Sequence, residues 1–196
     1  MQSDNTALSP HDVAAADAQR AAFLKTMPRS LLDLEDALPG IIAKAPGSGR
    51  SKLRRIYGVM DKISEVRKDF VACGKGCSDC CKMNVSISKL EARSISETTK
   101  RPFVDLSESV QHPVEAFVGK PCPFLVDEVC SIYEIRPLAC RRHASFHSSA
   151  AWCKPDLLLA EEVPLVQFGG IDQAFVELSI EKRHLVLADV RDFFPT

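Results

Sequence analysis

The stretch Cys73-Gly-Lys-Gly-Cys77-Ser-Asp-Cys80-Cys81 decides how this chain folds, because it gathers four of the eight cysteines within nine positions. Thiolates bind soft and borderline metals, and four of them close a tetrahedral site or hold an iron–sulfur cluster. Two residues separate Cys77 from Cys80, so one tight turn can direct both sulfurs at the same metal. This stretch therefore predicts a metal site.

Cys80 and Cys81 are adjacent, and neighbouring side chains diverge in a strand or a helix. We expect them to serve different metal atoms, or one of them to support the site without binding metal. Either arrangement favours a multinuclear cluster, or two ions, over a single zinc finger.

The later cysteines, Cys122, Cys130 and Cys140, lie too far apart for a local clip, so folding must return them to the first group. A disulfide framework would spread its bridges along the chain to close long loops. Here no cysteine precedes Cys73 or follows Cys153, which favours metal binding in a reducing compartment. The alternative, that these cysteines are unrelated buried residues that act as small hydrophobic side chains, would explain Cys153 alone.

Composition excludes several classes of function. The 196 residues suffice for one domain, with or without an appended arm, and 45% hydrophobic residues provide a core. The net charge of -1 gives no basic surface for nucleic acid. No run of about 18 apolar residues and no signal peptide is visible, so we expect a cytoplasmic protein without a membrane contact.

We expect a mainly α fold with short β hairpin elements: a small, metal-stabilised, irregular α+β domain with an N-terminal helical extension. The extension is residues 1–49, with Ser9 as the cap of a helix that Pro28 ends and a second short helix before Pro39-Gly40. The cysteine-cluster domain is residues 50–196, with its core at 73–153.

Within residues 50–196 the pattern predicts helices at 51–71, at 88–99 and at 171–187. Ser88 and Glu91 form a capping box for the second of these. The remaining expectations are a strand at 85–87, a loop at 100–121, a hairpin between Cys122 and Tyr133, and a short helix after a turn within 137–147.

The cysteine motifs resemble the YkgJ-type family of cysteine-cluster proteins, the CxxCxxCC domain that chelates zinc or iron. The resemblance rests on residues 73–81, on Pro121-Cys-Pro-Phe-Leu125, and on Cys130-Ser-Ile-Tyr-Glu-Ile-Arg-Pro-Leu-Ala-Cys140-Arg141. The chain departs from the shortest motif by having three residues between Cys73 and Cys77. The resemblance implies the metal-binding set Cys73, Cys77, Cys80, Cys81, Cys122, Cys130 and Cys140.

Within this resemblance we expect an iron–sulfur cluster of the 4Fe-4S type, with zinc as the alternative cofactor. Two other functions stay open. One is a structural zinc module that presents a surface to a protein partner. The other is a cluster-dependent group-transfer enzyme such as a protein methylase, since flagellin lysine N-methylases carry a similar cysteine cluster. No phosphate loop, nucleophile elbow or His-Glu-x-x-His motif is present.

Polar residues near the cysteines allow two interpretations each. Tyr133, Arg136 and Arg141 either offset the charge of an anionic thiolate site or are ordinary core and surface residues. His143 and His147, four apart, either join Cys140 and Cys153 in a separate zinc site or support the main site by hydrogen bonding.

Overall fold

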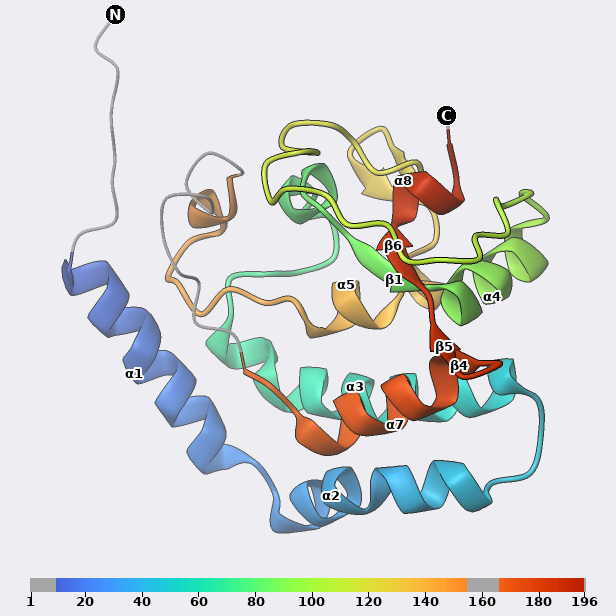
Figure 1. The fold of residues 1–196 in the computed structure, drawn as a ribbon. Helices are drawn as coiled ribbons and strands as arrows, with labels where there is room; N and C mark the ends of the chain where they lie inside the picture. Colours follow the sequence, from blue (N-terminus) through green and yellow to red (C-terminus); the bar gives the residue numbers. More distant parts are fainter. Residues whose placement is uncertain (1–9, 155–165, 196) are drawn as a thin grey trace, which may run out of the picture.

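The structure is a computed structural model that describes residues 10–154 and 166–195 (Figure 1). Three long helices lead the chain: α1 (Pro10–Thr26), α2 (Arg29–Lys44) and α3 (Gly49–Arg67). The shorter helices are α4 (Lys89–Thr99), α5 (Leu138–Arg142), α7 (Gly169–Ser179) and α8 (Val190–Phe193). The strands form three antiparallel pairs: β1 (Ser86–Ser88) with β6 (Leu187–Asp189), β2 (Leu125–Val126) with β3 (Val129–Cys130), and β4 (Ile180–Glu181) with β5 (His184–Leu185). The mainly helical fold class is confirmed.

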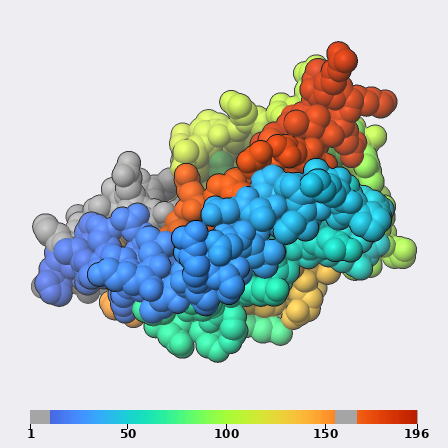
Figure 2. All heavy atoms as spheres, turned by 90° about the horizontal axis from the view of Figure 1, so that it is seen from below, coloured from blue at the N-terminus to red at the C-terminus, as the bar shows by residue number. Residues whose placement is uncertain are grey.

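One hydrophobic core joins the N-terminal helices to α7, which packs on both α2 and α3. Its large, fully buried side chains are Phe23, Leu38, Leu53, Ile56, Met60, Ile63, Phe146 and Ile171. Figure 2 shows the face on which α1 and α2 lie beside α3 and α7. The division at residue 49 stays a prediction, but α2 shares its core with helices of the second segment.

The sequence predicted that the second helix ends before Pro39, and this is wrong: α2 continues to Lys44. Proline has no N–H, so the carbonyl of Glu35 lacks its usual helical donor. Ile42 lies one turn beyond Leu38 on the buried face, and its burial favours continuation of the helix.

Gly170, at the start of α7, packs against this freed carbonyl. A Cβ built on Gly170 would lie 2.0 Å from the carbonyl oxygen of Glu35. The buried carboxylate of Glu35 also accepts the backbone N–H of Ile171 at 2.8 Å and so satisfies one free donor of α7. The two helices therefore touch backbone to backbone at this point.

A second core surrounds the β1–β6 pair, in which Ile87 faces Ala188. The predicted capping box at α4 is confirmed: the Ser88 side chain accepts the N–H of Glu91, and the Glu91 carboxylate accepts the N–H of Ser88. The strand near residues 85–87 and the hairpin after Cys122 are confirmed as β1 and as β2–β3.

The C-terminal helix is shorter than predicted, since α7 ends at Ser179 instead of near Leu187. Lys182 and Arg183 have positive φ angles of 50° and 71° and turn the chain into the β4–β5 hairpin. Pairing of Leu187–Asp189 with β1 then outweighs the helical spacing of the apolar residues, because it buries Val186 and Ala188.

At the other end, α1 runs from Pro10 to Thr26 as expected, while its predicted cap Ser9 lies outside the described residues. Phe23 anchors this helix against Phe146, with ring centroids 5.7 Å apart. No helix in the described ranges combines the length and the apolar character that crossing a membrane requires.

Candidate metal centre

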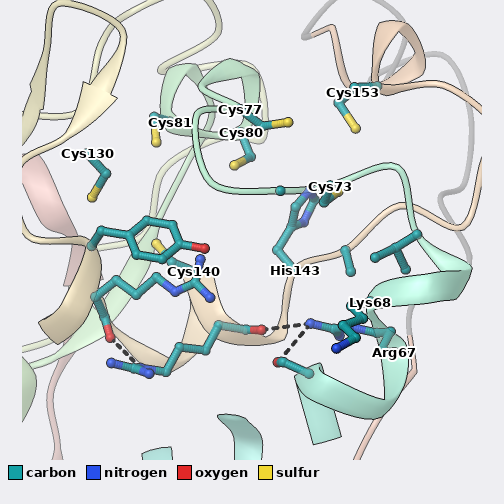
Figure 3. A pocket seen from close by; sticks show the side chains of 18 of the residues that line it. Arg67, Lys68, Cys73, Cys77, Cys80, Cys81, Cys130, Cys140, His143 and Cys153 are labelled. Atoms are coloured by element: carbon teal, nitrogen blue, oxygen red, sulfur yellow. Dashed lines mark hydrogen bonds between the residues drawn. The ribbon is translucent and has the colours of Figure 1, made fainter.

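A pocket of about 320 Å³ lies where the early and the late cysteine segments meet (Figure 3). We call it the cysteine pocket. Its lining includes seven thiols and one imidazole: Cys73, Cys77, Cys80, Cys81, Cys130, Cys140, Cys153 and His143. Six of the seven cysteines predicted as ligands are therefore brought to one place.

The seventh, Cys122, lies beside the pocket and is not part of its lining. Its backbone N–H donates to the carbonyl of Cys81 at 2.8 Å, which joins the two segments directly. Its thiol interacts electrostatically with those of Cys81 and Cys130. Burial raises the pKa of the Cys122 thiol to about 11, so it becomes a ligand only by losing its proton to a metal.

Local turns position the early cysteines. The N–H of Cys77 donates to the carbonyl of Gly74 at 3.1 Å, and the turn passes through Gly76 with a φ of 102°. A glycine suits this left-handed conformation. A short 3-10 helix, Asp79–Lys82, then carries Cys80 and Cys81.

The thiols of Cys80 and Cys81 interact with each other. They therefore diverge less than we expected for side chains that are adjacent in the sequence. They nevertheless face different neighbours. Cys81 interacts electrostatically with Cys122, Cys130 and Cys140, while Cys80 interacts with Cys140 and Cys73.

The β2–β3 hairpin is tied to the early cysteine segment by its tip. Asp127 and Glu128 occupy the turn with φ angles of 48° and 59°. The Glu128 carboxylate accepts the hydroxyl of Ser78 at 2.5 Å and the ammonium of Lys82 at 2.7 Å. These bonds fix Cys130, at the end of β3, relative to Cys80 and Cys81.

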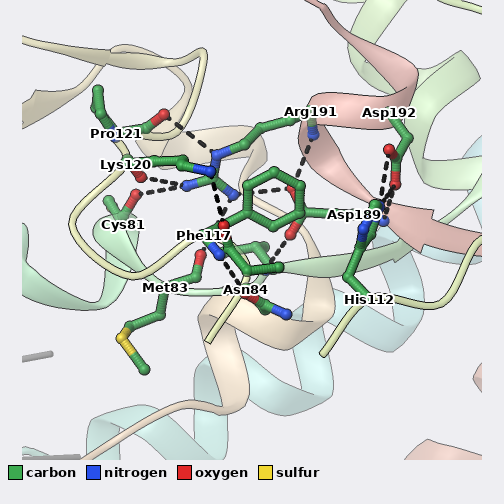
Figure 4. Close-up of polar contacts among 12 residues, drawn as sticks. Cys81, Met83, Asn84, His112, Phe117, Lys120, Pro121, Asp189, Arg191 and Asp192 are labelled. Carbon is green, nitrogen blue, oxygen red and sulfur yellow. Dashed lines mark hydrogen bonds and ion pairs between the residues drawn. The ribbon is translucent and has the colours of Figure 1, made fainter. Parts of the chain in front are cut away.

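Arg191 joins the early cysteine segment to the residues that precede Cys122 (Figure 4). Its guanidinium donates to the backbone carbonyls of Cys81, Met83, Lys120 and Pro121, at distances from 2.6 to 3.3 Å. Its charge is paired with Asp189 at 2.8 Å. Planar, five-donor arginine suits this clamp. The sequence analysis missed it because Arg191 is 110 residues from Cys81.

Arg141 and Arg136 differ in whether their charge is already paired within the protein. The buried Arg141 donates to the Asp61 carboxylate at 2.5 and 2.7 Å and to the carbonyls of Glu134 and Arg136, so its charge is already paired. Arg136 stacks on the Tyr133 ring at 4.2 Å, and its Nε is buried without a partner in the described part of the chain.

Arg67 is a buried cation of the cysteine pocket that sequence reasoning overlooked. It donates to the carbonyls of Arg141 and Arg142 at 3.0 and 2.9 Å, capping α5. Burial lowers its pKa to about 10, while the Cys73 thiolate opposes that shift. Arg67 follows Ile63 by four residues, on the apolar face of α3. A charged residue on the apolar face of a helix was the sequence signal that could have identified Arg67 as a buried cation.

His143 and His147 do not share a helix face, because α5 ends at Arg142 and His143 has an extended backbone. His143 lines the cysteine pocket, and its Nε2 is buried with no hydrogen-bond partner among the described residues. His147 is 4% exposed, and neither of its ring nitrogens has a hydrogen-bond partner in the part of the chain that the structure describes.

The donor set of the pocket fits a metal, since it combines thiols with an orphaned imidazole nitrogen. In the described ranges, however, no three His, Cys, Asp or Glu side chains stand close enough to hold one ion. Binding therefore requires the thiols to close in around the metal, as expected when metal binding completes folding.

This fold and pocket define a cysteine-cluster domain. Residues 72–155 match the model of the CxxCxxCC family, which is described as a "putative zinc- or iron-chelating domain". The match confirms the resemblance seen in the sequence. No curated protein and no solved structure matches the chain.

Proposed function

We propose that this protein binds an iron–sulfur cluster through the predicted cysteine thiolates, Cys73, Cys77, Cys80, Cys81, Cys122, Cys130 and Cys140. The observation that carries the proposal is the convergence of thiols from the early and late segments on one pocket. Such a concentration of thiols exceeds the four that a single zinc needs.

Within this set, Cys81, Cys122, Cys130 and Cys140 support a 4Fe-4S cluster best. Their thiols interact electrostatically with one another, and we call them the four-thiol group. Four thiolates are the usual complement of such a cluster. When bound, the cluster would supply one-electron chemistry, tuned by the cations and burial of the pocket.

The chain's own residues have defined tasks in this proposal. The Arg191 guanidinium and the backbone N–H of Cys122 hold the two cysteine segments together by donating to the carbonyl of Cys81. Arg67 offsets part of the negative charge that thiolates bring into the pocket. Burial raises the pKa of Cys140, so its thiol stays protonated until metal replaces the proton.

Anaerobic isolation tests the proposal. We expect a brown protein with about four iron and four acid-labile sulfide per chain. Two variants locate the cluster: Cys140→Ser should abolish the colour, whereas the control Ser149→Ala, at an exposed position of the same segment, should keep it. A colourless protein with stoichiometric zinc and no sulfide overturns the proposal.

A structural zinc module is the second candidate, and one observation favours it. His143 lines a thiol-rich pocket, and its buried Nε2 has no hydrogen-bond partner within residues 10–154 and 166–195. Histidine with cysteines is a common zinc ligand set. Cobalt substitution would then give a tetrahedral thiolate spectrum. The group-transfer enzyme stays a prediction, tested by calorimetry with S-adenosylmethionine.

A further inference from the structure

Helix α1 is anchored to the rest of the molecule by one large side chain. Within residues 11–26, only Ala16 and Phe23 are buried, and Phe23 is 0% exposed. Figure 1 shows α1 at the edge of the helical core, and its main contacts are with α3 and with the short 3-10 helix η1 (Lys68–Phe70). An alanine buries little apolar area, so the docking of α1 depends on Phe23.

Phe23 packs against two aromatic side chains that lie close to cysteines in the sequence. Its ring centroid lies 6.0 Å from that of Phe70, which precedes Cys73 by three residues. It lies 5.7 Å from that of Phe146, which is in the segment between α5 and Cys153. Aromatic rings attract one another at such separations. One side chain of α1 therefore contacts two segments that lead to cysteines of the pocket.

Backbone hydrogen bonds join these two segments next to the aromatic contacts. The N–H of Ala72 donates to the carbonyl of Ser145 at 3.2 Å, and the N–H of Ser145 donates to the Cys73 sulfur at 3.1 Å. Ser145 is 1% exposed, so both bonds are shielded from water while the segments stay together. A donor of this kind orients a thiolate ligand and supports its charge. The position of Cys73 in the pocket thus depends on the contact between the two segments.

From this geometry we propose that α1 is a brace for the cysteine pocket, in which Phe23 keeps Cys73 in place by holding the segments of Phe70 and Phe146 together. Undocking of α1 would separate Ala72 from Ser145 and release the Cys73 sulfur from its donor. Phe23 is a positioning residue, because it acts on Cys73 through the two aromatic rings. Helix α1 precedes residues 72–155, so the family motif assigns it no part in the site.

The inference rests on the proposed function only in expecting that the pocket releases metal faster when Cys73 is displaced. The brace itself is a contact between protein segments, which hydrogen exchange reports directly. Iron and sulfide content reports on the proposed function. Failure of one proposal can therefore be told from failure of the other.

Amide hydrogen exchange of the full chain, followed by NMR, tests the brace. Loss of a buried Phe side chain favours local opening by about 100-fold or more, so Phe23→Ala should speed exchange of the Ala72 and Ser145 N–H groups by about that factor. Leu24→Ala is the matched control, because Leu24 is the next residue of α1 and is 46% exposed. It should leave both rates unchanged. Phe23→Leu keeps an apolar side chain and should restore most of the protection.

A reference group separates local opening from general unfolding. The N–H of Val190 donates to the carbonyl of Val85 at 2.9 Å, and both residues belong to the second core. Its exchange rate in Phe23→Ala should equal that of the wild type. A rise at Val190 as large as that at Ala72 and Ser145 would mean general destabilisation and would overturn the inference.

Metal release gives a second measurement. In zinc-loaded protein, Phe23→Ala should lose zinc to a chelator faster than Leu24→Ala does, because displacement of Cys73 removes a ligand. The inference also fails if Phe23→Ala and Leu24→Ala show equal exchange at Ala72 and Ser145. If the chain takes up no metal, the proposed function fails, and the exchange rates alone decide whether α1 is a brace.

Discussion

Replacing Gly170 by alanine should destabilise the protein through one backbone contact. The new Cβ would lie 2.0 Å from the carbonyl oxygen of Glu35, and contacts below 3.0 Å essentially never occur, so α7 must move by about 1 Å. That movement also stretches the 2.8 Å bond from the Ile171 N–H to the Glu35 carboxylate. Overpacking costs about 1–3 kcal/mol, and a strained buried hydrogen bond adds about 1 kcal/mol.

Gly169→Ala is the matched control, because nothing lies within 4 Å of a Cβ at that position. There the substitution should leave stability unchanged or raise it by up to about 1 kcal/mol, since alanine restricts the unfolded chain. Urea unfolding of both variants, followed by circular dichroism in the same metal state, gives the comparison. Equal free energies of unfolding for the two variants would refute the reasoning.

Three other predictions concern buried polar contacts, pH and metal. Tyr57→Phe removes a 2.7 Å hydrogen bond to the buried Glu91 and should lower the free energy of unfolding by about 1–3 kcal/mol; denaturant titration checks this, and no change contradicts it. Arg93 holds the pKa of Glu181 below its usual range, which stabilises the fold above about pH 4.5 and is lost as pH falls through the lowered pKa. Glu181→Gln should therefore lose at most about 1 kcal/mol at pH 7 and nothing in stronger acid, so a difference that persists in acid in pH-dependent denaturation would count against the pair. Removing bound metal with a chelator should lower the Tm by scanning calorimetry, because a ligand of the folded state stabilises it, and an unchanged Tm would argue against metal-coupled folding.

The sequence predicted best those features that depend on neighbouring residues. The capping box at Ser88 and Glu91 is local, so the start of α4 was correct. The cysteine motif is also local, and its spacing required the late cysteines to return to the early ones. That Cys122 lies outside the lining of the pocket did not follow from spacing, because it depends on how folding orients each cysteine.

Features decided by distant contacts were missed. The continuation of α2 through Pro39 depends on packing against α7, and the end of α7 depends on pairing with β1. Arg67 was overlooked because the acceptors that justify its burial are carbonyls of α5. In each case tertiary contacts outweighed the local preference of the chain.

The clamp formed by Arg191 has a consequence for how the protein matures. During synthesis the early cysteine segment is made well before Arg191 exists, since 110 residues separate Arg191 from Cys81. Until Arg191 is made, the two cysteine segments lack the hydrogen bonds by which its guanidinium joins their backbones. The order of translation thus delays assembly of the cysteine pocket. A fragment limited to residues 72–155, the range that the family model matches, would lack Arg191 and its hydrogen bonds permanently.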